Sequence, residues 1–345
     1  MSEQELLVSK IGAVGRATLN RPEALNALTH AMALDLETAL DGWAQDPSVA
    51  MVLVDGTGER ALCAGGGIAD LHAHGVKGDF DFGRRFWADE YRLNAKIANS
   101  AKPYVAIMDG VTMGGGVGVS VHGSHRVVTE RSKIAMPECG IGLVPDVGGS
   151  FFLSRAPGRI GEYLAATGYR MGGADAVYAG FADAFVPGER RAALTEALLK
   201  KGDPSAIAEF SQEPETPPLA ALRERVDRHF GLPTAAECLA SLEDDGSEWA
   251  AKTVKAMRGA SPISLAVAHE LVRRVRASTT VEEALALEYR FTWRSMTEGD
   301  FLEGIRALII DKDKQPKWRI ARLEDVPPDL VESLLAPLGD SELTL

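Results

Sequence analysis

The chain has 345 residues, of which 46% are hydrophobic and 25% are charged, so it is long enough for one large domain with an appendage or for two domains. Its net charge of −12 argues against nucleic acid as a main partner and against binding to anionic membrane surfaces. Three cysteines without paired spacing (Cys63, Cys139 and Cys238) indicate a reducing compartment rather than a disulfide framework. The acidic first residues lack a signal or transit pattern, and no apolar run approaches about 18 residues, so we expect a cytoplasmic protein without a membrane span.

The first third of the chain alternates predicted strands and helices. Short strands are expected at 6–8 and 15–20, and Thr29 is the predicted N-cap of the helix that follows. An apolar strand at 49–54 is followed by the run Cys63-Ala64-Gly65-Gly66-Gly67. Glycines after a buried strand let backbone N–H groups approach a ligand closely, which makes this run a candidate binding segment.

The helix predicted over 81–100 carries a carboxylate on its apolar face. At about 100° per residue, its phenylalanine and aliphatic side chains share one face, and Glu90 falls among them. A carboxylate in such a stripe must be paired, protonated or used on a ligand. An ion pair with Arg85 or Arg92 is the structural alternative, although both arginines project to other faces.

A second glycine run follows a second apolar strand. Tyr104–Met108 is typical of a buried strand, and residues 111–118 read Val-Thr-Met-Gly-Gly-Gly-Val-Gly. Two such loops can each supply one backbone N–H to a developing oxyanion, and removing one donor typically costs about 10²–10³ in rate. His122 and His125 follow, but a His-x-x-His pair without a third ligand is more often structural, so no metal is expected.

Two carboxylates, Glu138 and Asp146, lie in a stretch of apolar and glycine residues that contains no Lys or Arg between Lys133 and Arg155. Apolar surroundings without a cation raise the pKa of a carboxyl group and are typical of functional acids. Pro137 and Pro145 directly precede the two acids and fix the local backbone. We therefore expect both acids to be presented from rigid corners; a glycine-rich loop with two solvated acids is the alternative.

The rest of the chain changes in character near residue 212. Helices are expected at 148–164, 174–182 and 190–201, with a short strand at 184–186 between the last two. Beyond a proline-rich segment only helices are expected, at 219–230, 234–242, 247–257, 262–276, 281–297 and 300–310. The pattern predicts an α/β core domain at 1–211, a linker at 212–218 and a helical C-terminal region at 219–345.

In combination, these motifs resemble the crotonase (enoyl-CoA hydratase/isomerase) superfamily, and within it most of all the 3-hydroxyisobutyryl-CoA hydrolases. The matching segments are Asn20-Arg21-Pro22, Asn26-Ala27-Leu28, Cys63-Ala64-Gly65-Gly66, Met113-Gly114-Gly115-Gly116, Met136-Pro137-Glu138 and Pro145-Asp146-Val147-Gly148-Gly149. The resemblance extends from about Leu7 to 316–318. It implies an α/β fold in which a crotonase-like spiral of ββα turns forms the core, followed by a C-terminal all-helical region that covers the acyl pocket or mediates assembly.

The resemblance also implies roles for individual residues. The N–H groups of Gly66 and Gly115 would form an oxyanion hole for a thioester carbonyl. Glu138 occupies the position of a catalytic glutamate shared with the hydratases. Asp146 stands where hydratases usually carry glycine, and it suits hydrogen bonding to a hydroxyl on the third carbon of the acyl group. Glu90 matches a third acid that contacts the substrate.

Further expectations concern the coenzyme A path and two departures from the pattern. Ala24, Leu25 and Ala64 are expected to bind the coenzyme A part of the substrate, although the residues alone favour a simple strand-to-helix connection at 23–26. Gly67 stands where the pattern normally has aspartate, which makes the assignment of Gly66 less secure than that of Gly115. Gly118 stands where hydratases carry their second glutamate.

The sequence therefore predicts hydrolysis of a short 3-hydroxyacyl-CoA, with 3-hydroxyisobutyryl-CoA of valine breakdown as the expected substrate. Glu138 would act as nucleophile or as general base. No cofactor is expected beyond the coenzyme A of the substrate, and association into a homo-oligomer is open. The alternatives are an enoyl-CoA hydratase or isomerase and a non-catalytic acyl-CoA binding protein. A serine thioesterase is disfavoured because the sequence contains no Gly-x-Ser-x-Gly motif.

Overall fold

The computed structural model describes residues 4–345, which form two compact units. Unit 1 comprises the described chain up to Gly67, together with Asp89–Ala135 and Arg170–Ala220. Unit 2 comprises Ile68–Ala88, Met136–Tyr169 and Ala221–Leu345. Each unit is thus assembled from segments that are separated in sequence. The division into domains at 1–211 and 219–345 with a linker at 212–218 stays a prediction.

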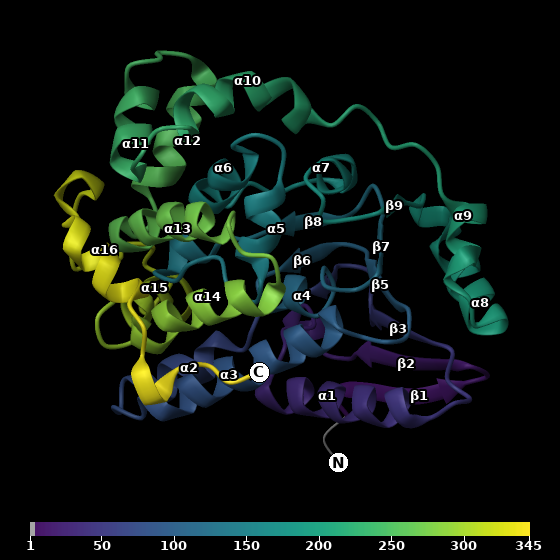
Figure 1. Cartoon of the computed structure of the whole chain (residues 1–345). Helices are drawn as coiled ribbons and strands as arrows, with labels where there is room; N and C mark the ends of the chain where they lie inside the picture. The colour runs from purple at the N-terminus through teal and green to yellow at the C-terminus, as the bar shows by residue number, and fades with distance from the viewer. Residues whose placement is uncertain (1–3) are drawn as a thin grey trace. The chain divides into compact units, whose positions relative to one another are not determined.

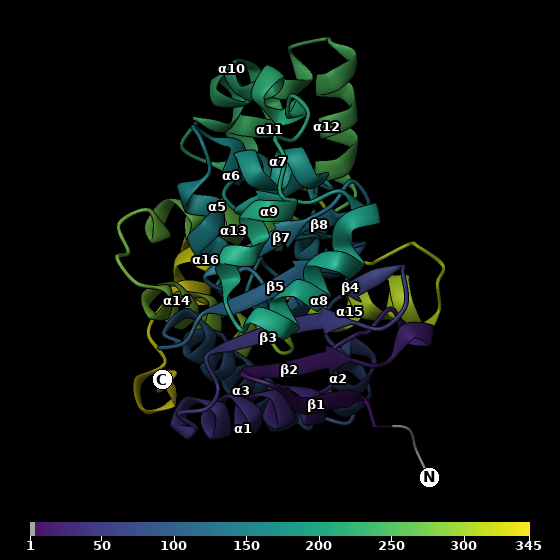
Figure 2. The same ribbon diagram turned by 90° about the vertical axis from the view of Figure 1, so that its right-hand side faces the viewer.

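The described strands all belong to unit 1 and form two sheets, one with the order β1-β2-β3-β5-β7-β9 and one with the order β4-β6-β8. Only the β1–β2 pair is antiparallel, and the other pairs are parallel. Figure 2 shows β1, β2, β3, β5 and β7 side by side in this order. The bounds are β1 (Leu6–Ile11), β2 (Val14–Leu19), β3 (Met51–Gly56), β4 (Ala61–Cys63), β5 (Tyr104–Met108), β6 (Val111–Met113), β7 (His125–Val128), β8 (Lys133–Ala135) and β9 (Ala184–Phe185).

Successive strands from β3 to β8 alternate between the two sheets. β3, β5 and β7 join the larger sheet, whereas β4, β6 and β8 join the smaller one. Because a helical segment follows each such pair of strands, the chain winds as a spiral of ββα turns, and the predicted fold class is confirmed. The alternation also brings the segments after β4 and β6, which are the two glycine runs, to the same end of the smaller sheet.

The core of unit 1 explains why its central strands are apolar throughout. Leu53, Val105 and Val127 from three adjacent strands pack in one cluster with Leu194 and Leu198. Parallel strands that are covered by helices are expected to be continuously apolar. The helices of this unit are α1 (His30–Gln45), the later part of α3 (Phe80–Ala98), α4 (Gly115–Gly118), α7 (Gly173–Tyr178), α8 (Arg191–Lys201) and α9 (Ile207–Phe210). The predicted N-cap is confirmed, since the Thr29 side chain accepts a hydrogen bond from the N–H of Met32.

Unit 2 is helical, as the second half of the sequence predicts (Figure 1). Its helices are α2 (Ile68–Gly75), the start of α3, α5 (Gly149–Arg155), α6 (Ile160–Thr167), α10 (Pro218–Phe230, from Ala221 onward), α11 (Ala235–Glu243), α12 (Glu248–Arg258), α13 (Pro262–Val275), α14 (Val281–Ser295), α15 (Phe301–Ile305) and α16 (Pro328–Leu335). The helix predicted at 148–164 is wrong in one respect: it breaks around Pro157, which lacks an N–H and forces an extended backbone at Ala156. None of the helices between residues 4 and 345 combines the length and the apolar character needed to cross a bilayer.

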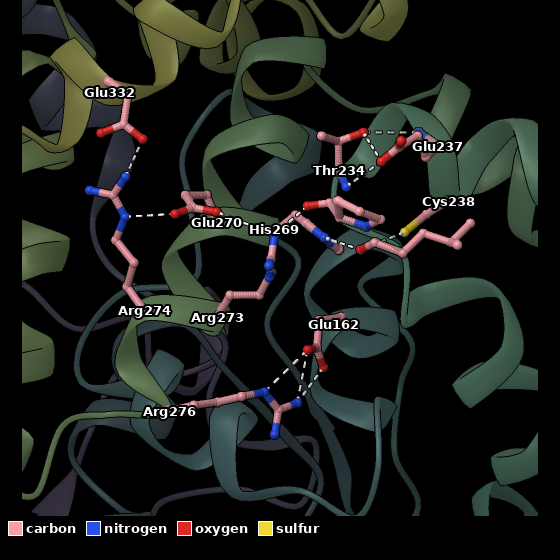
Figure 3. A network of polar contacts seen from close by, with 12 residues as sticks. Glu162, Thr234, Glu237, Cys238, His269, Glu270, Arg273, Arg274, Arg276 and Glu332 are labelled. Atoms are coloured by element: carbon pink, nitrogen blue, oxygen red, sulfur yellow. Dashed lines mark hydrogen bonds and ion pairs between the residues drawn. The ribbon is translucent and has the colours of Figure 1, made fainter.

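A network of ion pairs ties the helices of unit 2 together (Figure 3). The carboxylate of Glu162 on α6 is fully buried and accepts two close hydrogen bonds from the guanidinium of Arg276, at 2.7 and 2.8 Å. At the surface, Arg274 of α13 joins Glu270 of the same helix to Glu332 of α16. The buried acid of this network is thus neutralised by a cation, which is the usual condition for a charge in a protein interior.

Candidate active site

The two glycine runs meet in unit 1, beside the carboxylate of Glu90. A methyl group placed on Gly115 would lie 2.7 Å from Oε1 of Glu90 and 3.4 Å from the amide nitrogen of Gly66. A methyl group on Gly116 would overlap the backbone of Cys63. At Gly116 a side chain is excluded because the backbone following β6 packs directly against the backbone following β4, whereas at Gly115 it would meet the end of the Glu90 side chain. The structure therefore brings Gly66, Gly115 and Glu90 together.

The orientation of the Gly66 peptide follows from its hydrogen-bonded neighbours. Leu28 forms a parallel bridge with Gly66, in which the N–H of Leu28 donates to Gly65 and the N–H of Gly67 donates to Leu28, both at 2.8 Å. Polar groups alternate in direction along an extended backbone, so the N–H of Gly66 points away from Leu28. The N–H of Gly115, in the first turn of α4, has no acceptor within that helix. Both amides suit the role of donor to a ligand.

Glu90 is 3% exposed, and the ion pairs around it involve its neighbours. Arg92 binds Glu37 at 2.8 Å and Asp89 at 2.9 Å, and His30 contacts Asp89 at 2.7 Å. The expectation that Arg92 projects to another face of the helix is confirmed. Glu90 thus faces the two glycine runs, while Arg92 pairs with Glu37 and Asp89.

The segment predicted to line the coenzyme A path lies against the first glycine run. Leu25 and Asn26 adopt left-handed backbone conformations, with φ of 52° and 55°. The side chain of Asn26 accepts from the N–H of Arg21 and donates to the carbonyls of Thr57 and Ala61, which fixes this tight turn. The N–H of Ala64 donates to the carbonyl of Leu25 at 3.0 Å. Leu25 and Ala64 are therefore neighbours, and Ala24 precedes them on the same turn.

Glu138 lies in unit 2 and opens a single turn of 3₁₀ helix, Glu138–Ile141, rather than an irregular loop. Glu138 is buried, with 5% of its surface exposed. The N–H of Ser261 donates to the carbonyl of Cys139, and the backbone at Gly142 packs so closely on Asp300 that a methyl group would lie 2.5 Å from its carbonyl. Segments of the C-terminal region thus hold the turn that presents Glu138.

Asp146 occupies the rigid corner that the sequence predicts. It is 4% exposed, and its carbonyl accepts a 2.7 Å hydrogen bond from the N–H of Gly149. Between them, Val147 and Gly148 have φ of 53° and 75°. A left-handed conformation at a β-branched residue costs about 1–3 kcal/mol, so interactions elsewhere must stabilise this corner.

Glu288 on α14 provides that stabilisation, and the sequence analysis missed it. Its Oε2 accepts from the N–H of Gly148 at 2.7 Å, and its Oε1 accepts from the N–H of Ser150 at 3.1 Å and from the Ser150 hydroxyl. The signal that identifies Glu90 is present here too. At about 100° per residue, Glu288 lies within about 60° of Leu285 and Phe291, so it is also a carboxylate on an apolar helix face.

The predicted site residues therefore fall into two sets. One set lies in unit 1 and consists of Gly66, Gly115 and Glu90, together with Ala24, Leu25 and Ala64, which are predicted to line the coenzyme A path. Glu138 and Asp146 form the other in unit 2, eight residues apart on one buried stretch. The first set supplies hydrogen-bond donors and a buried acid, and the second supplies two further buried acids. Backbone donors and buried carboxylates are the kinds of group that act in acyl chemistry on a polarised carbonyl.

A cysteine nucleophile does not fit this chain. Burial raises the pKa of Cys63 and of Cys238 to about 12, and burial likewise raises the pKa of Cys139. The thiolate is the reactive form of cysteine, so these thiols are inert at neutral pH. Among residues 4–345, no group of three or more His, Cys, Asp or Glu side chains is arranged to hold a metal ion.

Comparison with known proteins decides the family. Residues 14–335 match the family model described as enoyl-CoA hydratase/isomerase. The chain belongs to the enoyl-CoA hydratase/isomerase family. Two curated proteins named 3-hydroxyisobutyryl-CoA hydrolase, mitochondrial, are similar to this chain. The Gallus gallus protein is 40% identical over 100% of this chain and 92% of its own length, and the Homo sapiens protein is 39% identical over 99% of this chain and 90% of its own length.

Solved structures of family members share the fold. An enoyl-CoA hydratase from Rhodobacter sphaeroides 2.4.1 has a TM-score of 0.96 and 50% identity, covering 99% of this chain and 100% of that one. A carnitinyl-CoA dehydratase from Mycobacterium thermoresistibile has a TM-score of 0.95 and 45% identity, covering 99% of both chains. Both likenesses span the strand spiral and the C-terminal helices, so the complete architecture is common to these members of the enoyl-CoA hydratase/isomerase family.

The burial of Glu288 predicts a pH-dependent stability. Burial raises the pKa of Glu288 from 4.5 to about 8, against the hydrogen bonds from Ser150 and Gly148, and the charge of Asp146 raises it further. The folded protein therefore keeps a proton that the unfolded chain has released, and stability is lost as the pH rises from about 4.5 to about 8. At 1.36 kcal/mol per pKa unit, the loss in the free energy of unfolding reaches about 5 kcal/mol. The Glu288→Gln protein should not show this loss, because its side chain does not titrate. Denaturant unfolding of the unaltered protein and of Glu288→Gln between pH 5 and pH 8.5 measures this difference in pH dependence. If the free energy of unfolding of the two proteins changed with pH in parallel, the prediction would be contradicted.

Proposed function

We propose that the protein hydrolyses the thioester of a short 3-hydroxyacyl-CoA, with 3-hydroxyisobutyryl-CoA, an intermediate of valine breakdown, as its substrate. Relatives that carry this activity in their names align with the whole chain at about 40% identity. The observation that carries the proposal is which positions hold an acid: Asp146 is present, and the second glutamate of the hydratases is absent. Asp146 is buried in a fixed corner, while Gly118, where a hydratase would need its second glutamate, is a buried glycine of α4.

The proposed reaction gives each predicted site residue its own role. Gly66 and Gly115 donate their N–H groups to the carbonyl oxygen as negative charge develops on it. Ala24, Leu25 and Ala64 lie along the coenzyme A part of the substrate.

Glu138 supplies the catalytic carboxylate in this proposal. In the covalent route its oxygen attacks the carbonyl carbon, the bond to sulfur breaks, coenzyme A leaves as a thiol after protonation, and water then hydrolyses the mixed anhydride. In the general-base route Glu138 removes a proton from the attacking water. Asp146 binds the 3-hydroxyl of the acyl group, and Glu90 contacts the acyl group near the oxyanion hole.

A hydratase is the second candidate, because the solved structures with 45–50% identity are named as a hydratase and a dehydratase. Addition of water to a double bond usually employs two carboxylates, and in this chain the second of them is replaced by Gly118. Thiol release from 3-hydroxyisobutyryl-CoA, compared with hydration of crotonyl-CoA measured by the loss of its double-bond absorbance, separates the two activities. The proposal requires thiol release and little hydration.

The compartment of the protein and its association into a homo-oligomer stay open in this proposal. The vertebrate relatives are named as mitochondrial proteins, whereas the sequence predicts a cytoplasmic location for this chain, which stays a prediction. Coenzyme A enters as part of the substrate, and no separate cofactor is invoked.

Replacing Glu138 tests the catalytic carboxylate. Glu138→Gln should reduce thiol release from 3-hydroxyisobutyryl-CoA by about 10³-fold or more, because an amide neither attacks nor accepts a proton. Glu213→Gln, the same change at an exposed position, should leave the rate within about twofold. In ¹⁸O-water, label enters Glu138 only if Glu138 attacks and water then opens the anhydride at the Glu138 carbonyl, so labelled Glu138 demonstrates the covalent route. Full activity in Glu138→Gln would remove the residue from the mechanism.

Replacing Asp146 tests recognition of the hydroxyl. Sites built to hydrogen-bond a substrate hydroxyl reject analogues that lack it by up to about 10⁴–10⁵. In Asp146→Asn the ratio of kcat/KM for 3-hydroxyisobutyryl-CoA to that for isobutyryl-CoA should therefore fall by at least about tenfold, and in Asp146→Gly it should fall further. Thiol release from both substrates gives the ratio. An equal loss on both substrates would show that Asp146 has no part in recognising the hydroxyl.

A further inference from the structure

The carboxylate of Glu288 is completely buried, and the reaction described above does not use it. All three of its hydrogen-bond donors come from residues 148–150, the segment that directly follows Asp146 and Val147. Two of these donors are backbone N–H groups, so they fix the direction of the chain itself. A side chain from α14 thus holds the corner that presents Asp146.

Glu162, the other fully buried glutamate of unit 2, shows what a purely structural buried acid looks like in this protein. Glu162 is neutralised by the guanidinium groups of Arg276 and Arg159, at 2.7 and 3.0 Å. Among the ion pairs of residues 4–345, none involves Glu288. Glu288 instead accepts hydrogen bonds from Gly148 and Ser150, which belong to one strained corner. Such specific use of a costly buried acid indicates a role in the geometry of that corner.

The electrostatic setting agrees with this interpretation. Asp146 and Glu288 lie close enough for the charge of Asp146 to favour the protonated form of Glu288. A neutral Glu288 keeps its contacts with Ser150 and adds no second negative charge beside Asp146.

We propose that Glu288 is a positioning residue for the reaction, which fixes the corner carrying Asp146 and thereby sets the selectivity for acyl groups that bear a 3-hydroxyl. The inference rests on the proposed function, because it gives Asp146 the role of hydroxyl acceptor. Glu288 itself touches no substrate; it acts by preventing the residues around Val147 from relaxing to a right-handed conformation that would turn the Asp146 side chain away.

The test compares thiol release from 3-hydroxyisobutyryl-CoA and isobutyryl-CoA, which differ only in the hydroxyl. In Glu288→Gln one oxygen acceptor becomes an N–H donor facing a backbone N–H, so the corner loosens. The ratio of the two kcat/KM values should fall by at least about tenfold, while kcat/KM for isobutyryl-CoA changes by less than about threefold. A role in stability alone would reduce both values together.

Two further variants keep the test decisive. Ser150→Ala removes the hydroxyl donor but neither amide, so it should lower the ratio in the same direction by a smaller factor, and it carries the test if Glu288→Gln does not fold. Glu283→Gln makes the same chemical change on the same helix at its capping box, where glutamine also serves, and should leave the ratio unchanged.

The outcomes separate this inference from the function on which it rests. If the unaltered protein releases no thiol from either substrate, the proposed function is wrong. If it is selective and Asp146→Asn lowers the ratio, but Glu288→Gln and Ser150→Ala both keep the original ratio, the positioning role is overturned. If both variants lower the ratio and Glu283→Gln does not, the role is supported.

Discussion

The close approach of the backbone at Gly115 to Gly66 and to the carboxylate of Glu90 is the constraint on which the candidate site depends. A methyl group on the α-carbon of Gly115 would displace the carboxylate of Glu90. The spiral produces this approach, because alternate strands build the smaller sheet and bring the segments after β4 and β6 side by side. The fold thereby places two backbone amides next to a buried acid without any specialised side chain between them.

The second set of functional residues depends on helices far along the chain. The turn at Glu138 is held by Ser261 and Asp300, and the corner at Asp146 is held by Glu288. The C-terminal helices therefore hold the segments that carry two buried acids, Glu138 and Asp146.

Much of this arrangement can be predicted from the sequence, and the exceptions have physical causes. Tyr104–Met108 and the capped helix after Thr29 carry strong local signals and are confirmed. Strands such as β4, β6 and β8 have three residues each, too few to show a period. The apolar face of a helix reveals Glu90 and would have revealed Glu288, but its partners Gly148 and Ser150 lie about 140 residues away, and no local pattern encodes such contacts.

The most direct test of the central claim is the effect of Gly115→Ala on kcat/KM for thiol release from 3-hydroxyisobutyryl-CoA, with Gly42→Ala as the matched control. The added methyl group meets the end of the Glu90 side chain, so the protein should fold while kcat/KM falls by about 10²-fold or more. At Gly42, in α1, the methyl group meets open space, and activity should be unchanged with equal or higher thermal stability. Unchanged kcat/KM in a folded Gly115→Ala protein would contradict the account.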